Sequence, residues 1–228
     1  QRKLYLANQD RIAQQVQHRE AGEFKKDKLK VLAELTKLRQ ICCDPRLHYE
    51  DYKAGSAKLD TCMELVHGAL DGGHRILLFS QFTGMLDIIG KRLAKEDIAF
   101  LKLTGASSKE SRAKMVAQFQ AGEVPVFLIS LKAGGVGLNL TAADVVIHYD
   151  PWWNVAAQDQ ATDRAHRIGQ QHTVTVYKLI AKDTIEERIM QMQESKRDLV
   201  NSVLGGDGIS SALFTREDVL ALLGGDGR

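Results

Sequence analysis

The sequence predicts an α/β fold in which a parallel β-sheet is covered by helices on both faces. Two observations lead to this prediction: the chain contains several short apolar runs, and segments of helical periodicity separate them. Alternation of this kind is typical of a buried parallel sheet with helical crossovers. The runs, which we expect to form strands, are residues 76–80, 99–103, 126–130, 145–149 and 174–180.

Residues 1–43, which precede the predicted sheet, read as helices. Apolar residues recur there at the spacing of an amphipathic helix, and Gly22 is the expected break between two helices. The dipeptide Asp44-Pro45 ends the helical pattern, and a polar loop follows over residues 48–55. The apolar stripe consists of Val31, Leu32, Leu35, Leu38 and Ile41.

A further helix is predicted after the last strand. Thr184 can cap it, with Glu187 as the partner in a capping box. An apolar stripe follows, and the glycines of residues 205–208 end the helix, after which residues 210–223 can add a short one. The stripe consists of Ile185, Ile189, Met192, Leu199 and Val203. We therefore expect a helical region over residues 1–50, a sheet domain over 51–181 and a helix with its tail over 182–228.

Composition excludes several classes of protein. The chain has 228 residues, and its 31 basic and 29 acidic side chains give a net charge of only +2, so nucleic-acid binding would need a local basic patch. The 3 cysteines match no CxxC pattern, and their odd number argues against a secreted disulfide framework. No apolar run is long enough to cross a membrane. We expect a soluble protein with reduced thiols.

The most informative segment is residues 159–170. On a helix, Gln160, Arg164 and Arg167 project from one face, and two neighbouring guanidinium groups favour an anion such as a phosphate. Ala161, Ala165 and Ile168 form a second stripe that can pack against a domain. The alternative is a solvated helix in which Asp163 pairs with Arg167.

This segment resembles motif six of the Swi/Snf-type ATPases of helicase superfamily two, whose pattern reads QAxDRxHRIGQ. Other blocks match the family in the right order, so the resemblance covers residues 75–181. Val155 departs from it, because the family commonly has Pro after Trp-Asn. The blocks are residues 77–82 (motif four), residues 103–105 with Arg112 and Phe119, and residues 130–140 with 150–154 (motif five).

The resemblance implies a RecA-like second motor lobe, flanked by N-terminal linking helices and a C-terminal brace helix. The sequence lacks the P-loop pattern GxxxxGK[ST] and a DExH box, and the glycines at 84 and 90 are too far apart to imitate the former, so we expect an ordinary helix there. By resemblance, ATP and Mg²⁺ would bind mainly to an N-terminal RecA-like lobe of the same polypeptide, and Gln1 would not be its natural start. We predict no metal-ligand set in this chain.

The loops that follow the first three predicted strands carry small hydroxyls, glycine and lysine. Such groups contact phosphates, and loops after parallel strands meet at one edge of the sheet. The alternative is routine capping of the next helix. We take as candidate DNA-binding residues Ser80, Gln81, Thr104, Gly105, Ser130, Lys132 and, by resemblance, Trp153, for which simple packing is equally compatible with the sequence.

By resemblance, Arg164 and Arg167 would be arginine fingers for ATP hydrolysis, and Gln160 would face the nucleotide. Gly135 and Gly137 allow close backbone approach, which suits a phosphate or a neighbouring lobe. Leu140 occupies the third glycine position of a GxGxxG pattern, which excludes a nicotinamide site. We expect His148 to be a hydrogen-bonded core residue and His166 to be structural rather than a general base.

The resemblance thus implies an ATP hydrolase that moves along double-stranded DNA without separating the strands, with the isolated chain inactive. Two alternatives stay open: the second lobe of an RNA helicase, or a non-enzymatic module that binds nucleic acid or a protein partner. RNA helicase relatives usually carry an additional arginine after HRIGR, where this chain has Gln170 and Gln171. We expect a monomer without membrane contact that acts on the bacterial nucleoid in the cytoplasm rather than in a nucleus.

Overall fold

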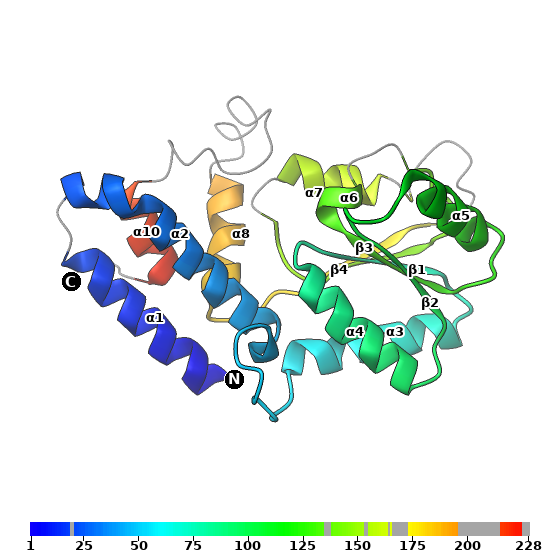
Figure 1. The fold of residues 1–228 in the computed structure, drawn as a ribbon, viewed down its shortest axis with the longest axis horizontal. Helices are drawn as coiled ribbons and strands as arrows, with labels where there is room; N and C mark the ends of the chain where they lie inside the picture. The colour runs from blue at the N-terminus through cyan, green and yellow to red at the C-terminus, as the bar shows by residue number, and fades with distance from the viewer. Residues whose placement is uncertain are drawn as a thin grey trace. The chain divides into compact units, whose positions relative to one another are not determined.

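A computed structural model describes residues 1–18, 21–134, 138–152, 155–163, 165, 173–195 and 215–224 of the chain. The chain divides into two compact units. Residues 57–180 form one, here called the sheet unit, and residues 1–56 together with 181–228 form the other, here called the helical unit. Figure 1 shows the elements of both.

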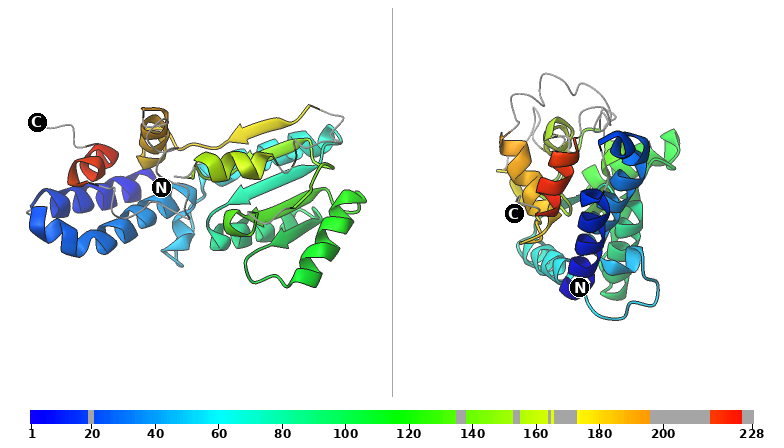
Figure 2. Two further views of the ribbon diagram at one scale, coloured as in Figure 1. Left: turned by 90° about the horizontal axis from the view of Figure 1, so that it is seen from above. Right: turned by 90° about the vertical axis from the view of Figure 1, so that its left-hand side faces the viewer.

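The sheet unit contains one parallel sheet of five strands in the order β2-β3-β1-β4-β5. Figure 2 shows these strands running in one direction. The strands are β1 (Ile76–Ser80), β2 (Phe100–Leu103), β3 (Val126–Ser130), β4 (Val145–His148) and β5 (Thr175–Lys178). The predicted parallel sheet is therefore confirmed, and every predicted strand is present.

Helices cover both faces of this sheet, as predicted: in Figure 1, α3 and α4 lie on one side and α5, α6 and α7 on the other. Alternate strand residues face the two layers. Leu77 and Phe79 pack in one buried cluster with Phe119 of α5 and Ala161 of α7. These helices are α3 (Ala57–Asp71), α4 (Thr83–Lys95), α5 (Lys109–Gln120), α6 (Leu131–Gly134) and α7 (Val155–Thr162).

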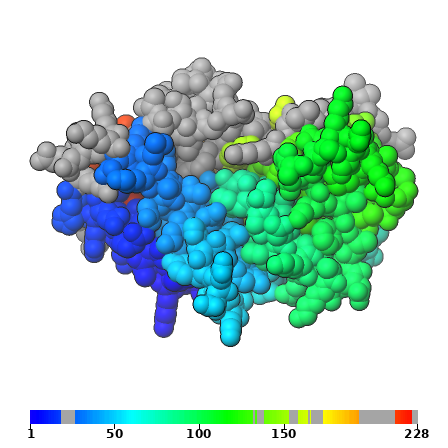
Figure 3. Space-filling view, viewed as in Figure 1, coloured from blue at the N-terminus to red at the C-terminus, as the bar shows by residue number. Residues whose placement is uncertain are grey.

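Gly90 marks the close approach of α4 to the other face. A Cβ atom at this position would lie 3.0 Å from the ring of Phe100, so glycine lets the helix settle on β2. Gly84 and Gly90 both lie within α4, so the predicted ordinary helix is confirmed. Residues of α4 and α5 form much of the green surface of the sheet unit in Figure 3.

The helical unit joins the two ends of the described chain. Its elements are α1 (Arg2–Gln17), α2 (Ala21–Cys43), the short 3₁₀ helix η1 (Pro45–Leu47), α8 (Ile185–Ser195) and α10 (Arg216–Leu223). The amide N–H of Ile185 donates to the Tyr5 hydroxyl at 2.7 Å, and the Gln9 amide donates to the Leu223 carbonyl at 2.6 Å. Most of the predicted stripe on α2 is buried, with Leu32 half-buried.

Two local predictions need correction. Gly22 does not break the helix, because it lies in the first turn of α2, where the backbone N–H groups need no helical partner and glycine is tolerated. The predicted capping box of α8 is also shifted by one residue. The Thr184 hydroxyl accepts from the N–H of Glu186, while the Glu187 carboxylate accepts from the N–H of Asp183.

The regular capping box lies at the start of α10. The Thr215 hydroxyl accepts from the N–H of Asp218, and the Asp218 carboxylate accepts from the N–H of Thr215. The second half of the predicted α8 stripe, Leu199 and Val203, lies outside the described residues. Within the described ranges, no helix is both long and apolar enough to cross a membrane, and no cluster of His, Cys, Asp or Glu could hold a metal ion.

Candidate nucleic-acid interface and nucleotide-facing helix

The carboxyl ends of β1, β2 and β3 surround a hollow of about 400 Å³, here called the edge hollow. Ser80 and Ser130 are register partners in β1 and β3, and Thr104 follows the last residue of β2. The structure therefore brings together most of the described candidates for phosphate contact. The hollow is lined by Gln81, Thr83, Asp87, Lys102, Thr104, Gly105, Ala106 and Ser130.

Ser80 is fully buried, and its hydroxyl belongs to a network around Asp150. The hydroxyl donates to the Asp150 carboxylate and accepts from the N–H of Phe82 at 3.1 Å. Asp150 is 1% exposed and also accepts from the backbone N–H of Gln81 at 3.3 Å. This network fixes the end of β1 against Asp150, which lies two residues after the end of β4.

The side-chain amide of Gln81 has a fixed orientation. Its Nε2 donates to Asp150 Oδ2 at 2.6 Å and to the Pro151 carbonyl at 3.3 Å. Both partners only accept hydrogen bonds, so the nitrogen must face them. In this arrangement Gln81 has only its Oε1, an acceptor, left for the edge hollow, so the donors that a phosphate needs must come from other residues.

Ser130 and Thr104 are such donors. The Ser130 hydroxyl accepts from the N–H of Ala133 at 3.3 Å at the start of α6, and the Thr104 hydroxyl accepts from the N–H of Ala106 at 3.4 Å. The capping and turn contacts that sequence analysis named as the alternative are therefore present. Neither hydroxyl donates to another residue in the described ranges, so each keeps its proton for an acceptor in the hollow.

Lys102 adds a positive charge that sequence analysis missed. It is the exposed residue of β2, whose other side chains are half-buried or buried, and its ammonium group pairs with the carboxylate of Asp87 on α4. Both side chains are substantially exposed, at 40% for Lys102 and 51% for Asp87. The signal in the sequence is the single lysine within the run Phe100–Leu103.

Helix α7 begins the segment with the predicted arginine face. Ala161 and Ala165 are buried, whereas Gln160 is exposed, as the two-stripe interpretation expects. Gln158 is buried, and its amide oxygen accepts from the N–H of Trp152 at 3.2 Å. The described residues do not include Arg164, His166, Arg167, Gly135, Gly137 and Trp153, nor the side chain of Lys132, so these stay predictions.

His148 is a buried residue of β4, as predicted, with 1% exposure. Its ring stacks on Phe79 with centroids 5.5 Å apart, and its Nε2 lies 2.9 Å from the Thr162 hydroxyl. That hydroxyl donates its hydrogen to the Gln158 carbonyl. Its oxygen therefore accepts from Nε2 of His148, so Nε2 carries the proton of the ring. Burial, assisted by the charge of Lys178, lowers the pKa of His148 to about 4. The prediction of a hydrogen-bonded histidine holds for Nε2 only, because Nδ1 has no partner in the part of the chain that the structure describes.

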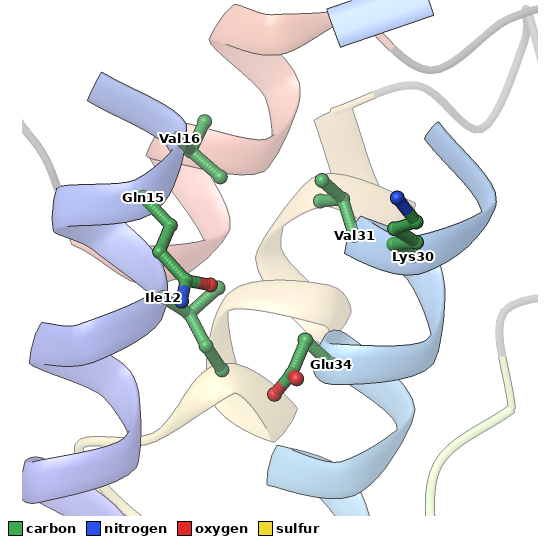
Figure 4. A pocket seen from close by; sticks show the side chains of 6 residues that line it. All are labelled: Ile12, Gln15, Val16, Lys30, Val31 and Glu34. Carbon is green, nitrogen blue, oxygen red and sulfur yellow. The ribbon is translucent and has the colours of Figure 1, made fainter. Parts of the chain in front are cut away.

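A second hollow, of about 220 Å³, lies between α1 and α2 in the helical unit. Figure 4 shows Ile12, Gln15 and Val16 of α1 facing Lys30, Val31 and Glu34 of α2. Its charges are balanced locally, because Lys30 pairs with Asp27 at 2.9 Å and Glu34 pairs with Arg11 at 2.5 Å. None of the candidate site residues lines this hollow.

Comparison with known proteins places the chain in a family. The family described as "Helicase conserved C-terminal domain" matches residues 57–169. The solved C-terminal domain of the Sulfolobus solfataricus SWI2/SNF2 ATPase is similar over 96% of this chain and 91% of that domain, with 31% identity and a TM-score of 0.77. The chain belongs to the Swi2/Snf2 ATPase family. It corresponds to the C-terminal, RecA-like helicase lobe, as the sequence motifs indicate.

The chain is also similar to parts of larger proteins. The S. solfataricus SWI2/SNF2 ATPase core solved in complex with double-stranded DNA is 34% identical, with a TM-score of 0.79 over 96% of this chain and 46% of that one. An uncharacterized ATP-dependent helicase of Mycoplasma pneumoniae is 40% identical over 96% of this chain. The chain spans about a fifth of that relative's length, 21%.

Proposed function

We propose that this Swi2/Snf2 lobe is the second motor lobe of an ATP-dependent translocase on double-stranded DNA. The observation that carries the proposal is the edge hollow, where the protons of Ser130 and Thr104 and the charge of Lys102 converge at the carboxyl ends of three parallel strands. Ligands of open α/β sheets bind at such edges. The similarity to an ATPase core solved with double-stranded DNA supports DNA as the ligand.

In this proposal the edge hollow contacts the phosphates of one DNA strand. Ser130, Thr104 and Gly105 donate hydrogen bonds. Together with Lys132 and Trp153 they form the surface that contacts the strand, here called the DNA track. Ser80 and Gln81 shape this edge through Asp150, because their donors are already bonded to that carboxylate. Phosphate contacts hold a strand without reading its sequence, which suits a protein that moves along DNA.

The nucleotide would be ATP with Mg²⁺, held mainly by an N-terminal lobe of the same polypeptide. ATP supplies the phosphoanhydride bond whose hydrolysis drives movement. The residues here fit the role of a second lobe, because Ala161 of α7 and Ala165 beyond its end are buried while Gln160 is exposed. Arg164 and Arg167 neutralise the charge that develops on the transferred phosphoryl group, and Gly135 and Gly137 allow close approach of the two lobes.

His148 supports this arrangement. Its hydrogen bond to Thr162 fixes the last turn of α7 on the sheet, two residues before Arg164. Because the helix end is already held in place, Arg164 loses less conformational freedom when the lobes close. We infer that His148 positions the arginine segment without contact with the nucleotide.

The test uses a polypeptide that carries both lobes. Arg164→Ala and Arg167→Ala should each reduce steady-state ATP turnover by about 10³-fold or more, the range reported for arginine fingers, while circular dichroism and DNA affinity stay unchanged. Asp159→Ala is the matched control, because Asp159 is exposed on α7 and lies just outside the quoted motif. Collapse of the dichroism spectrum in the arginine variants would instead assign these residues to the fold.

Two other readings predict different results. A second lobe of an RNA helicase would be stimulated by RNA rather than by duplex DNA, and a non-enzymatic module would show no turnover that depends on the arginines. Gln170 and Gln171, in place of the additional arginine of RNA helicase relatives, favour DNA. We propose a monomeric motor acting on the bacterial nucleoid.

A further inference from the structure

Lys102 and Asp87 face each other across the edge hollow, and no family motif quoted above includes either residue. We propose that they form an exchangeable ion pair. Lys102 leaves Asp87 to contact an incoming DNA phosphate, and Asp87 weakens DNA binding because it competes with the phosphate for the ammonium group. This inference rests on the proposed function, because it takes the edge hollow as part of the DNA track.

The charges that line the hollow support it. Among the lining residues, Lys102 is the cation and Asp87 is the carboxylate, and the others are neutral. The neutral donors, Ser130, Thr104 and Gly105, can orient a phosphate but cannot balance its charge. Among the described residues that line the hollow, Lys102 is therefore the one whose charge would balance the charge of a phosphate.

The position of Lys102 suits this role. It lies on β2 directly before Leu103, and Thr104 and Gly105 follow, so its side chain and the loop donors line one hollow. Asp87 lies on α4, about one turn after Thr83, another lining residue. The two charged residues thus line the hollow from two different elements, a strand and a helix.

The pair is also weak enough to exchange. With 40% of the Lys102 side chain and 51% of the Asp87 side chain exposed, water screens the attraction between them. Exposed ion pairs of this kind contribute little to stability. A phosphate that also receives hydrogen bonds from two hydroxyls can therefore compete with Asp87 for the ammonium group.

The experiment measures binding of this chain to a short fluorescent DNA duplex by anisotropy, over a series of salt concentrations. We expect Lys102→Met to weaken binding about fivefold at low salt, as loss of one solvent-screened charge contact would. The slope of log affinity against log salt should become shallower by about 0.9, the value for one phosphate contact. Asp87→Asn should have the opposite effect and strengthen binding. Lys102→Arg should retain most of the affinity.

Matched controls separate a local effect from net charge. Lys91→Met removes one positive charge from an exposed site on α4, and Asp71→Asn removes one negative charge from an exposed site on α3; neither residue lines the hollow. If Lys102→Met and Asp87→Asn change affinity no more than these controls while the wild-type chain binds duplex DNA, the ion-pair inference is wrong and the DNA track stands. If the wild-type chain does not bind duplex DNA even at low salt, the proposed DNA track fails and the inference fails with it.

Discussion

The Nε2 atom of His148 lies 2.9 Å from the hydroxyl oxygen of Thr162, and this contact joins strand β4 to the last turn of α7. The same histidine ring stacks on Phe79 of β1. One buried imidazole therefore ties two strands to the helix that leads into the arginine motif. Because the ring is buried and Nδ1 has no partner within the described residues, the ring is stable there only in its neutral form.

The pH dependence of stability follows from this burial. The pKa of His148 is lowered from 6.5 to about 4 by burial, so the unfolded chain takes up a proton at pH values where the folded chain does not. Stability from this residue is fully present above pH 6.5 and is lost as pH falls toward 4. The expected loss is about 3 kcal/mol, measured by urea unfolding at a series of pH values.

His148→Phe tests the assignment to this residue. Phenylalanine can keep the stacking on Phe79, removes the unpartnered Nδ1 and loses only the hydrogen bond to Thr162, so stability at pH 7 should change by about 1 kcal/mol. Its pH dependence between 6.5 and 4 should be flatter than that of the wild type. An unchanged slope would assign the titration to another group.

Asp150→Asn should destabilise the sheet unit by about 2 kcal/mol, because an amide nitrogen in place of one carboxylate oxygen faces donors on Ser80 or Gln81. Both tryptophans, Trp152 and Trp153, lie in this unit, so their fluorescence during urea unfolding reports on it. Asp163→Asn, at an exposed position, is the control and should stay within about 0.5 kcal/mol. Equal effects of the two substitutions would contradict the buried network.

The cysteines should be inert in the folded protein. Cys42, Cys43 and Cys62 are all buried and form no disulfide within the described residues, and burial raises the pKa of Cys62 to about 12. A thiol reagent such as Ellman's reagent should therefore react slowly with native protein at pH 8, and with all 3 thiols after denaturation. Rapid reaction of one thiol without denaturant would show that its site opens readily.

The strands were predictable because each is an apolar run of a length that suits a buried strand. Their order in the sheet was not predicted, because register and neighbours depend on contacts between distant residues, such as β1 with β3 and β4. Gly22 was misinterpreted because local propensity does not say whether a glycine falls in the first turn of a helix or between helices.

The candidate site shows the same limit. Sequence analysis found Ser130 and Thr104, because small hydroxyls after parallel strands gather at one edge. It placed Asp150 in a matching block but gave it no role, because Asp150 is 70 residues from Ser80 along the chain and meets it only through strand pairing. It also missed Lys102, because a lysine within a short strand reads as an ordinary solvent-facing residue until the fold shows which hollow it lines.

The central claim is that this lobe works in a DNA-dependent ATPase. Its most direct test is steady-state ATP turnover by the polypeptide that carries both lobes, measured with duplex DNA, with RNA and with neither at one fixed salt concentration. The proposed function predicts strong stimulation by duplex DNA alone. Stimulation by RNA, or by neither nucleic acid, would contradict it.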